Sequence, residues 1–364
     1  MKDESIVDVA IVGAGIVGLM CAYFFVEEGY RVIIFEKEQE AGQGVTKNQS
    51  GVIHVVQLPF NSLKSKLARR GNPMYDDICK RLGVKLKRLS ALLVINKIAS
   101  YPALIIGYLY LRLNLRGNFK VSLVGKKTLQ KMEPELSDSV KAGIKIDGYG
   151  VVDTEGMVGR LSNFLQNKGA RIFFGCEFLS GSCGDELIQI RSSCGEFKTR
   201  FIVNASGLYS DEVCKRLGLE VAKLTPGLGV MLECSGLQVN NIIAPFSLIQ
   251  SERTKGGGII PTTKATVSIG PTLRLIDDKK TYKVDDRDII SLKKKFFPLL
   301  KHEGDVVRVY SGVRPLSPTG DFMVYSFCKG RIISLLGIES PGLTAAPAIA
   351  EHVLLLAKQR SDSG

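Results

Sequence analysis

The most constraining feature of this sequence is a strand–helix–strand pattern that begins within its first ten residues. An apolar run leads into three glycines, Gly13, Gly15 and Gly18. A helix-forming stretch ends near Gly29, and a second apolar run ends at the acidic residue Glu36. All parts of a dinucleotide-binding βαβ unit therefore occur in the right order within one short segment.

The glycines and the acid of this unit each have a physical task. Gly13 would make the tight turn out of the strand, Gly15 would let the backbone approach a pyrophosphate, and Gly18 would let the helix pack closely on the sheet. Glu36 stands where a carboxylate accepts the hydroxyl hydrogens of a ribose. The alternative is that the glycines serve only a tight turn. The unit alone leaves NAD and FAD open, because both carry the same ribose and pyrophosphate.

Length and cysteine content narrow the class of protein. A chain of 364 residues exceeds one comfortable core, so we expect two domains. The acidic start runs directly into the first strand and leaves no room for a signal peptide, which indicates a cytoplasmic protein. Eight cysteines without a CxxC pair, and only three histidines, argue against a metal or iron–sulfur site and favour reduced, buried thiols. Cys183 and Cys194 flank a predicted hairpin and could pair.

The formal net charge of +13 calls for an anionic partner or a structural reason. Lysines are scattered along the chain, no run of basic residues exceeds three, and no aromatic platform lies among them. This pattern argues against nucleic-acid binding. A solvated lysine-rich surface is the favoured explanation, and attraction to a membrane surface is the alternative.

The segment at residues 100–115, SYPALIIGYLYLRLNL, is apolar on nearly every side of a helix. Its run of about ten apolar residues is too short to span a bilayer. We favour burial, because a helix that is apolar all round normally lies in a core. The alternative is that residues 101–116 dock on a membrane or a small anchoring subunit, with Tyr108, Tyr110 and the arginines at the interface. The protein would then lie peripherally on the cytoplasmic face of a membrane.

Later segments continue the α/β pattern and add an antiparallel region. A helix-then-strand pattern recurs at residues 153–174, and a buried strand ends in a second glycine turn at residues 205–207. Residues 222–315 contain alternating runs that predict an antiparallel sheet, and residues 331–359 predict a buried strand, a turn and an apolar helix. The expected fold is α/β, with a second, smaller α+β domain.

Six ordered segments resemble the FAD-dependent D-amino-acid-oxidase-like superfamily, within the branch of flavin-linked glycerol-3-phosphate dehydrogenases and L-2-hydroxyglutarate dehydrogenases. They are the N-terminal unit, NQSGVIH (48–54), VNASGLYSDEV (203–213), GGGIIPTTKATVSIGPT (256–272), SGVRPL (311–316) and GIESPGLTAAPAIAEHV (337–353). The resemblance implies FAD, because in this superfamily the C-terminal glycine turn returns to cover the isoalloxazine ring. It also implies a discontinuous Rossmann-type FAD-binding domain (1–85, 143–220 and 310–364) and a substrate-binding domain (86–142 and 221–309).

The family motifs imply a set of cofactor-binding residues. Cys176 lies where the family passes the adenine. The last segment would place backbone N–H groups at a helix N-terminus, where they stabilise negative charge on the flavin. The implied cofactor residues are Gly13, Gly15, Gly18, Glu36, Lys37, Thr46, Asn48, Ser50, Gly51, Glu177, Ala205, Ser206, Gly207, Gly337, Ser340, Pro341, Gly342, Leu343 and Thr344.

Oxidation of a secondary alcohol also needs a base and, for an anionic substrate, cations. His54 is the base candidate, because it ends the flavin loop and the ordinary pKa of histidine lies near the working range. A structural histidine in the core is the alternative. An arginine binds phosphate or carboxylate through two parallel hydrogen bonds, although such residues taken singly more often form surface ion pairs. The candidates for anion binding, with the first preferred, are Arg314, Arg274, Lys255 and Arg253.

The implied reaction is oxidation of sn-glycerol 3-phosphate to dihydroxyacetone phosphate by hydride transfer to flavin N5, with electrons passed to a quinone or carrier. A 2-hydroxy acid such as L-2-hydroxyglutarate is the alternative substrate, and an amine or amino acid is less favoured. A non-catalytic FAD-binding subunit of a larger complex is the alternative from another class. The anaerobic bacterial glycerol-3-phosphate dehydrogenase subunit and its aerobic relatives continue beyond the flavin segment. This sequence ends soon after it, so we expect a different route for the electrons. A homodimer is left open.

Overall fold

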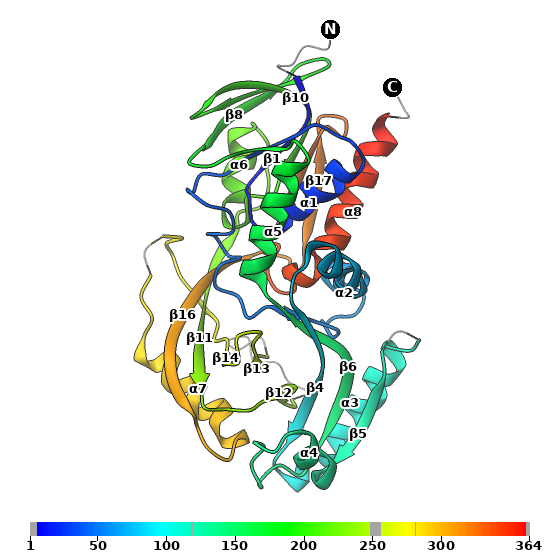
Figure 1. Cartoon of the computed structure of the whole chain (residues 1–364), viewed down its shortest axis with the longest axis vertical. Helices are drawn as coiled ribbons and strands as arrows, with labels where there is room; N and C mark the ends of the chain where they lie inside the picture. Colours follow the sequence, from blue (N-terminus) through cyan, green and yellow to red (C-terminus); the bar gives the residue numbers. More distant parts are fainter. Residues whose placement is uncertain (1–5, 118, 248–255, 281, 362–364) are drawn as a thin grey trace.

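The computed structural model describes residues 6–117, 119–247, 256–280 and 282–361. Figure 1 shows an elongated molecule with two lobes, and the first described strand, β1, and the last helix, α8, both lie in the upper lobe. Long strands, among them β4 (Leu86–Ile95) and β6 (Ala142–Val152), extend from the junction into the lower lobe. Each lobe is built on its own sheet.

The upper sheet has the strand order β17-β18-β10-β1-β2-β7, and β8 and β9 extend it beside β10. The five neighbours from β18 to β7 run parallel to one another. The central strands are almost continuously apolar, which suits a parallel sheet that is covered on both faces. The strands are β1 (Ile6–Val12), β2 (Val32–Phe35), β7 (Arg171–Phe173), β8 (Phe178–Cys183), β9 (Ile188–Ser192), β10 (Gly195–Asn204), β17 (Met323–Phe327) and β18 (Ile332–Leu336).

Four helices pack with this sheet around one core: α1 (Ile16–Glu27), α2 (Leu63–Leu82), α5 (Thr154–Asn167) and α8 (Gly342–Ser361). Helices α2 and α8 approach so closely that a Cβ added to Gly71 would lie 2.3 Å from the carbonyl oxygen of Thr344. Ser62 caps α2 by accepting a hydrogen bond from the Ser65 N–H at 3.2 Å. Helix α6 (Ser210–Arg216) contributes Val213 to a separate core that also contains residues of β8 and β9.

The lower sheet has the order β15-β11-β14-β13-β12-β4-β6-β3, with β16 paired to β11 and β5 paired to β6. The β12–β4 pair is parallel and the other pairs are antiparallel. The remaining strands are β3 (Val52–Ile53), β5 (Val121–Gly125), β11 (Thr225–Ser235), β12 (Ile242–Pro245), β13 (Gly258–Pro261), β14 (Val267–Gly270), β15 (Arg274–Leu275) and β16 (Asp305–Leu316).

The helices of the lower lobe are α3 (Tyr101–Asn114), α4 (Lys126–Met132) and α7 (Asp286–Phe296). Short 3-10 turns occupy Ile98–Ser100, Gly207–Tyr209 and Phe297–Leu299. A parallel sheet joined to a largely antiparallel one confirms the predicted fold class. Strand β6 belongs to the lower sheet, although the predicted boundary at residue 143 assigns most of it to the FAD-binding domain.

Helix α3 is buried on one face only. Leu104, Gly107 and Leu111 are buried, whereas the side chains of Ile106 and Leu113 remain 60% and 59% exposed. The favoured prediction of complete burial is therefore wrong. Apolar residues occupy nearly the whole circumference of the helix, but the sheet buries only one side of it. Within the described ranges, no helix combines the length and hydropathy needed to cross a bilayer.

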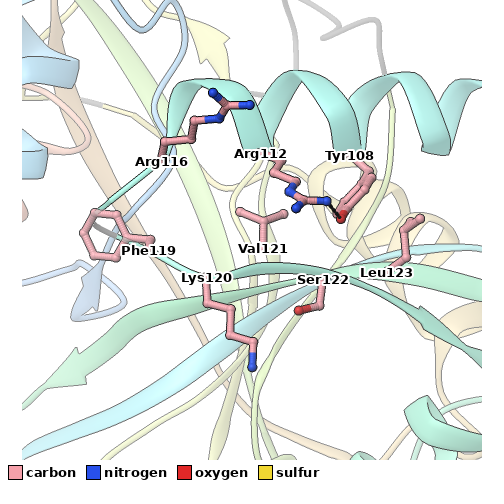
Figure 2. A pocket seen from close by; sticks show the side chains of 8 residues that line it. All are labelled: Tyr108, Arg112, Arg116, Phe119, Lys120, Val121, Ser122 and Leu123. Atoms are coloured by element: carbon pink, nitrogen blue, oxygen red, sulfur yellow. Dashed lines mark hydrogen bonds between the residues drawn. The ribbon is translucent and has the colours of Figure 1, made fainter.

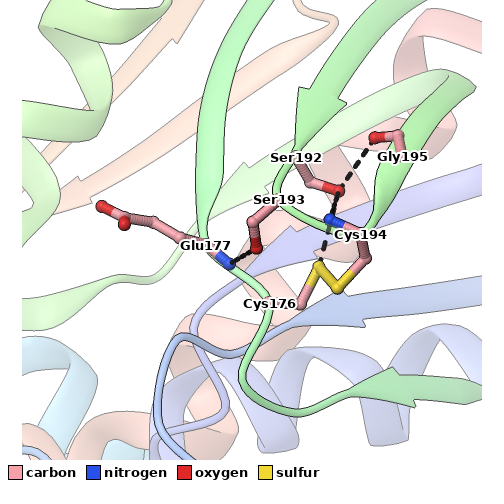
Figure 3. Close-up of a disulfide and its surroundings, with 6 residues drawn as sticks. All are labelled: Cys176, Glu177, Ser192, Ser193, Cys194 and Gly195. Carbon is pink, nitrogen blue, oxygen red and sulfur yellow. Dashed lines mark hydrogen bonds between the residues drawn. A yellow bond between two sulfur atoms is a disulfide. The ribbon is translucent and has the colours of Figure 1, made fainter.

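Four of the eight cysteines form disulfides, Cys176 with Cys194 and Cys183 with Cys328. Figure 3 shows the first pair beside Ser192, whose hydroxyl accepts a hydrogen bond from the Cys194 N–H at 3.2 Å. The expectation of reduced thiols is wrong for these four residues, and Cys183 does not pair with Cys194. The partner of Cys183 lies 145 residues away, a separation that no local pattern reveals. The free and buried cysteines are Cys21, Cys79, Cys214 and Cys234.

The Cys183–Cys328 disulfide should contribute measurably to stability, because it closes a loop of 145 residues and so restricts the unfolded chain. We expect Cys183→Ser to lower the free energy of unfolding of the oxidised protein by about 2–4 kcal/mol. Urea unfolding without reductant measures this difference. With reductant present, the variant and the wild type should converge. Equal stability without reductant would contradict the assignment, as would alkylation of more than the four free cysteines in the denatured, unreduced protein.

Candidate functional site

A cavity of about 510 Å³ lies between the two sheets and is lined by residues of both. The carboxyl ends of β1, β2 and β10 open onto it through Val12, Phe35 and Ala205. Ligands of open parallel sheets bind outside the carboxyl ends of the strands. The lower sheet contributes Met231 and Arg314 to the opposite wall.

The N-terminal glycines form a backbone cradle at the upper wall of this cavity. Gly13 has a φ of 103°, and a Cβ added to it would lie 2.7 Å from the carbonyl oxygen of Ala205. Gly13 and Gly15 line the cavity, whereas Gly18 lies behind them, where an added Cβ would lie 2.0 Å from the Gly13 carbonyl oxygen. Helix α1 has no side-chain cap and no acid in its first turn, so its N-terminus suits a pyrophosphate.

The predicted ribose ligand Glu36 also lines the cavity, at the end of β2. Its carboxylate accepts hydrogen bonds from the N–H groups of Ala14 at 2.7 Å and Glu38 at 3.0 Å. Burial raises the pKa of Glu36, and these two hydrogen bonds act in the opposite direction. Beside it, the ammonium of Lys37 lies 3.5 Å from the ring centroid of Tyr209.

The predicted adenine-side and second-turn residues also line the cavity. Glu177 forms an ion pair with Arg216 at 2.7 Å, and both residues face the cavity. Cys176 lines it next to Glu177 and is held in its disulfide. The second glycine turn contributes all three of its predicted residues, namely Ala205, Ser206 and Gly207.

The loop after β2 contributes Thr46, Asn48 and Ser50 to the lining. The Thr46 hydroxyl accepts a hydrogen bond from the Ile16 N–H at 3.1 Å, which fixes the loop against the start of α1. Gly51 is not among the lining residues. It has a φ of 72°, and an added Cβ would lie 2.5 Å from the Val152 carbonyl oxygen. Gly51 therefore supports the loop from behind.

The C-terminal segment places the start of α8 at the cavity. Its lining residues are Ile338, Glu339, Ser340, Pro341, Gly342 and Leu343. The predicted residues Gly337 and Thr344 are not in the lining. The Thr344 hydroxyl accepts a hydrogen bond from the His54 N–H at 3.0 Å and donates one to the Val52 carbonyl at 3.3 Å. Thr344 therefore positions the strand that carries His54.

His54 lines the cavity and is half-buried. Burial lowers its pKa to about 4, and the positive charge of Arg314 contributes in the same direction. The imidazole is therefore neutral near pH 7 and can accept a proton. The Asn72 side chain donates a hydrogen bond to the His54 carbonyl at 2.8 Å, and the Tyr149 ring lies 6.1 Å from the imidazole between ring centroids.

Arg314 projects from β16 into the same cavity. Burial lowers its pKa, and the negative charge of Glu339 opposes that effect. Glu339 in turn lies 3.8 Å from the ammonium of Lys64, and both of these residues are only 5% exposed. Arg314 and Glu339 thus lie at the cavity wall, and Lys64 lies next to Glu339.

Of the other predicted anion-binding residues, only Arg274 lies within the described part of the chain, and it does not join Arg314. The Arg274 guanidinium forms an ion pair with Asp288 at 3.3 Å, also donates to the Lys283 carbonyl, and is absent from the lining. The structure therefore pairs Arg274 with Asp288 away from the cavity lining, and its role in substrate binding stays a prediction. Arg253 and Lys255 lie outside the described residues.

Several lining residues were missed by the sequence reasoning. Lys279 pairs with Asp211 at 3.0 Å and Glu212 at 2.7 Å, and Lys280 and Tyr282 follow it in the lining. No motif marks these lysines, because a Lys-Lys pair in a loop normally indicates a solvated surface. Among the residues that the structure describes, no group of three or more His, Cys, Asp or Glu side chains could hold a metal ion.

Comparison with known proteins gives the same fold and cofactor. The model of a family described as FAD dependent oxidoreductase matches residues 8–355. The glycerol 3-phosphate dehydrogenase of Caloramator mitchellensis is 27% identical over 361 residues, which cover 96% of this chain and 74% of the relative. The mitochondrial L-2-hydroxyglutarate dehydrogenase of Arabidopsis thaliana is 27% identical, with coverage of 95% and 82%. The structure of L-alpha-glycerophosphate oxidase from Mycoplasma pneumoniae with FAD bound superposes with a TM-score of 0.88, at 24% identity and coverage of 97% and 95%.

The cradle at Gly13 gives a prediction about cofactor retention. We expect Gly13→Ala to abolish co-purification of FAD, because its methyl group would collide with the Ala205 carbonyl at the pyrophosphate turn. The ratio of flavin to protein absorbance measures the occupancy. Gly169→Ala is the matched control, since Gly169 also has a positive φ, 87°, but an added Cβ meets nothing within 4 Å. That variant should lose about 1 kcal/mol of stability and keep its FAD. Full occupancy in Gly13→Ala would contradict the predicted site.

The lowered pKa of His54 predicts a specific pH dependence of stability. An unfolded histidine has a pKa of about 6.5 and the folded one of about 4, so the unfolded state binds more protons between these values. The stability associated with neutral His54 is full above pH 6.5 and is lost as the pH falls towards 4. Lowering the pH from about 7 to about 5 should reduce the unfolding free energy of both proteins. The reduction should be about 1–2 kcal/mol smaller in His54→Gln than in the wild type, because the variant has no histidine to protonate at this position. Urea unfolding at both pH values tests this, and parallel losses would contradict it.

Proposed function

This chain belongs to the FAD-dependent oxidoreductase family, and on that premise we propose that it oxidises sn-glycerol 3-phosphate to dihydroxyacetone phosphate. The observation that carries the proposal is the presence of His54 and Arg314 in one cavity. They are close enough for the charge of Arg314 to contribute to the lowered pKa of His54. A neutral base next to a fixed cation is what oxidation of an anionic alcohol requires.

FAD is the cofactor, and when bound it supplies the acceptor for the hydride that leaves the carbinol carbon. The proposed holding residues are those of the cradle. Gly13, Gly15 and the start of α1 suit the pyrophosphate, and Glu36 suits the ribose. The N-terminus of α8, which begins at Gly342, would stabilise negative charge on the isoalloxazine ring.

His54 would accept the hydroxyl proton of the substrate. Its pKa of about 4 keeps it neutral near pH 7, so it is available as a base without prior deprotonation. Its backbone is fixed on both sides, by Thr344 at the N–H and by Asn72 at the carbonyl. These two hydrogen bonds would limit movement of the imidazole relative to the reacting carbon.

Arg314 would bind the phosphate of the substrate. A buried guanidinium has little water to solvate it, which favours exchange of that water for phosphate oxygens. Glu339 also lines the cavity, where its charge acts on Arg314, and its carboxylate lies 3.8 Å from the ammonium of Lys64. Arg314 would thereby orient the carbinol towards His54.

The relatives support an anionic hydroxy compound as the substrate class, because their names include glycerol 3-phosphate dehydrogenase and L-2-hydroxyglutarate dehydrogenase. L-2-hydroxyglutarate is therefore the second candidate substrate, since arginine binds a carboxylate as well as a phosphate. The proposed acceptor of the electrons is a quinone or another carrier. Molecular oxygen is the competing acceptor, because one of the relatives is named glycerol 3-phosphate oxidase.

Anaerobic reduction of the bound flavin tests the proposal directly. We expect sn-glycerol 3-phosphate to bleach the flavin absorbance and glycerol to leave it unchanged at the same concentration, since glycerol lacks the anion that Arg314 would bind. Bleaching by L-2-hydroxyglutarate alone would replace our choice with the second candidate. If no alcohol, hydroxy acid or amine bleaches an FAD-loaded protein, the non-catalytic subunit becomes the better description. Reoxidation by oxygen, compared with that by a quinone analogue, then identifies the acceptor.

Steady-state kinetics separate the two proposed roles. Arg314→Met should raise KM by about 10- to 100-fold, because a charge-assisted hydrogen bond contributes about 1.5–3 kcal/mol. His54→Gln should lower kcat by about 10²- to 10⁴-fold, as expected for loss of a general base. Arg274→Met serves as the control, since Arg274 is absent from the cavity lining, and its kinetics should match the wild type. A control that loses activity as strongly as Arg314→Met would remove the basis for assigning the anion site.

A further inference from the structure

Helix α3 presents a continuous apolar surface to solvent. Its large side chains are exposed from the preceding turn to the last turn of the helix. In an α-helix, Ile105, Leu109 and Leu113 recur at intervals of four residues and therefore lie on one face. We call this surface the α3 patch, and it consists of Ile98, Tyr101, Ile105, Ile106, Leu109, Tyr110 and Leu113.

The opposite face holds α3 firmly on the lower lobe. A Cβ added to Gly107 would lie 2.4 Å from the ring of Phe246, so the helix backbone packs directly against that side chain. At its edge, the Tyr110 ring packs against Phe60, with 5.6 Å between the ring centroids. The α3 patch is thus a fixed surface. Its exposure does not come from fraying of the helix.

Three cations lie beside the α3 patch, around an open hollow of about 580 Å³. Figure 2 shows Arg112 on α3, Arg116 just after the end of that helix, and Lys120 on the chain that leads into β5. The Arg112 guanidinium donates a hydrogen bond to the Tyr108 hydroxyl at 3.0 Å, which keeps it at the edge of the helix. The three cationic groups point in different directions and do not converge on one point.

The sequence around α3 is depleted of acids. Residues 78–132 contain twelve lysines and arginines and no aspartate or glutamate. At the density of the whole chain, 36 acids in 364 residues, a segment of this length would hold about five. Within the described residues, no carboxylate lies within ion-pair distance of Arg112, Arg116 or Lys120. Asp147, the acid that Lys120 influences, is bound to Lys145 at 2.7 Å.

We propose that the α3 patch and these three cations dock the protein on the surface of a bilayer that contains anionic lipids. The apolar side chains would enter the boundary between headgroups and acyl chains, with the helix lying in the plane of the interface. Tyr101 and Tyr110 would lie at the headgroup level, where tyrosine is enriched in membrane proteins. Arg112, Arg116 and Lys120 would contact lipid phosphates, since each basic residue near an anionic leaflet strengthens binding by about fivefold.

The positive charge around α3 favours a lipid surface over a second copy of the chain or a small free anion as the partner of the α3 patch. A symmetric contact between two copies would set the same acid-free, basic segment against itself, and like charges across an interface oppose association. A small free anion would require cations that converge, which these do not. An anionic bilayer can contact dispersed cations through its phosphates and an apolar strip through its acyl chains at the same time. The inference does not depend on the proposed substrate, because no residue of the α3 patch lines the cavity.

Co-sedimentation of the FAD-loaded protein with lipid vesicles tests the proposal. We expect strong binding to vesicles of phosphatidylcholine that contain phosphatidylglycerol, weak binding to phosphatidylcholine alone, and release by high salt. Inorganic phosphate at matched ionic strength should release the protein no more than chloride does, because the ligand is a surface. Ile106→Ser with Leu113→Ser, and separately Arg112→Glu with Arg116→Glu, should each reduce the partition coefficient at least about tenfold.

Matched controls come from the other side of the lower lobe, where α7 lies (Figure 1). Ile290 on α7 is 61% exposed, as exposed as Ile106, so Ile290→Ser is the matched control for the single substitution Ile106→Ser. Lys294→Glu with Lys301→Glu makes the same change in net charge away from α3. Both controls should bind vesicles like the wild type. Flavin absorbance and the unfolding temperature show whether each variant is folded.

Several results would overturn the proposal. Failure of the wild type to bind anionic vesicles is one of them. Equal binding of the wild type and the α3 variants is another, as is equal loss in the α7 controls. A dimer that dissociates on substitution of the α3 patch, without any vesicle binding, would assign the surface to a second copy of the chain. The readout is sedimentation, so a failure of the proposed dehydrogenase activity would leave it unaffected.

Discussion

The side-chain hydroxyl of Thr344 connects two parts of the chain on which the cavity depends. It accepts a hydrogen bond from His54 and donates one to Val52, across 290 residues of sequence. On the other side of the same residue, its carbonyl lies so close to α2 that only glycine fits at position 71. The first turn of α8 is therefore fixed between the short strand β3 and helix α2. Displacement of this turn would move one wall of the cavity and the base candidate together.

Charge inside the cavity follows from the same construction. Helix α8 begins just after Glu339, so the fixed turn also fixes the carboxylate that pairs with Lys64 and whose charge acts on Arg314. Breaking a buried charge cluster by removing one partner leaves the other charge unsolvated, which is far more costly than losing a surface ion pair. The position of Arg314, its lowered pKa and the neutral state of His54 thus depend on one another through burial and short-range charge.

The sequence predicts best those parts of the molecule in which the interacting residues are close together along the chain. The tight turn at Gly13 and the carboxylate at Glu36 lie within one βαβ unit, so spacing alone fixes their relation to the strand ends. The ion pair of Arg274 with Asp288 could not be predicted, because a motif gives the position of Arg274 along the chain but not the residue beside it. The Lys64–Glu339 contact has no local sign either, since a lysine in an amphipathic helix normally points to solvent. The burial of α3 could not be decided from its own apolar pattern, because it depends on how wide a surface the sheet offers.

The fixed turn at the start of α8 also sets an order of events during synthesis. The cradle of Gly13 and the strand of His54 are made early, but the cavity gains its last wall only when residues 338–343 have been added. Contacts between segments so far apart in sequence form late, because the long intervening loop must close first. A nascent chain that lacks these residues has a dinucleotide cradle but no enclosed site. A chain interrupted before residue 338 would therefore carry the sequence pattern of a dinucleotide cradle without the last wall of the cavity.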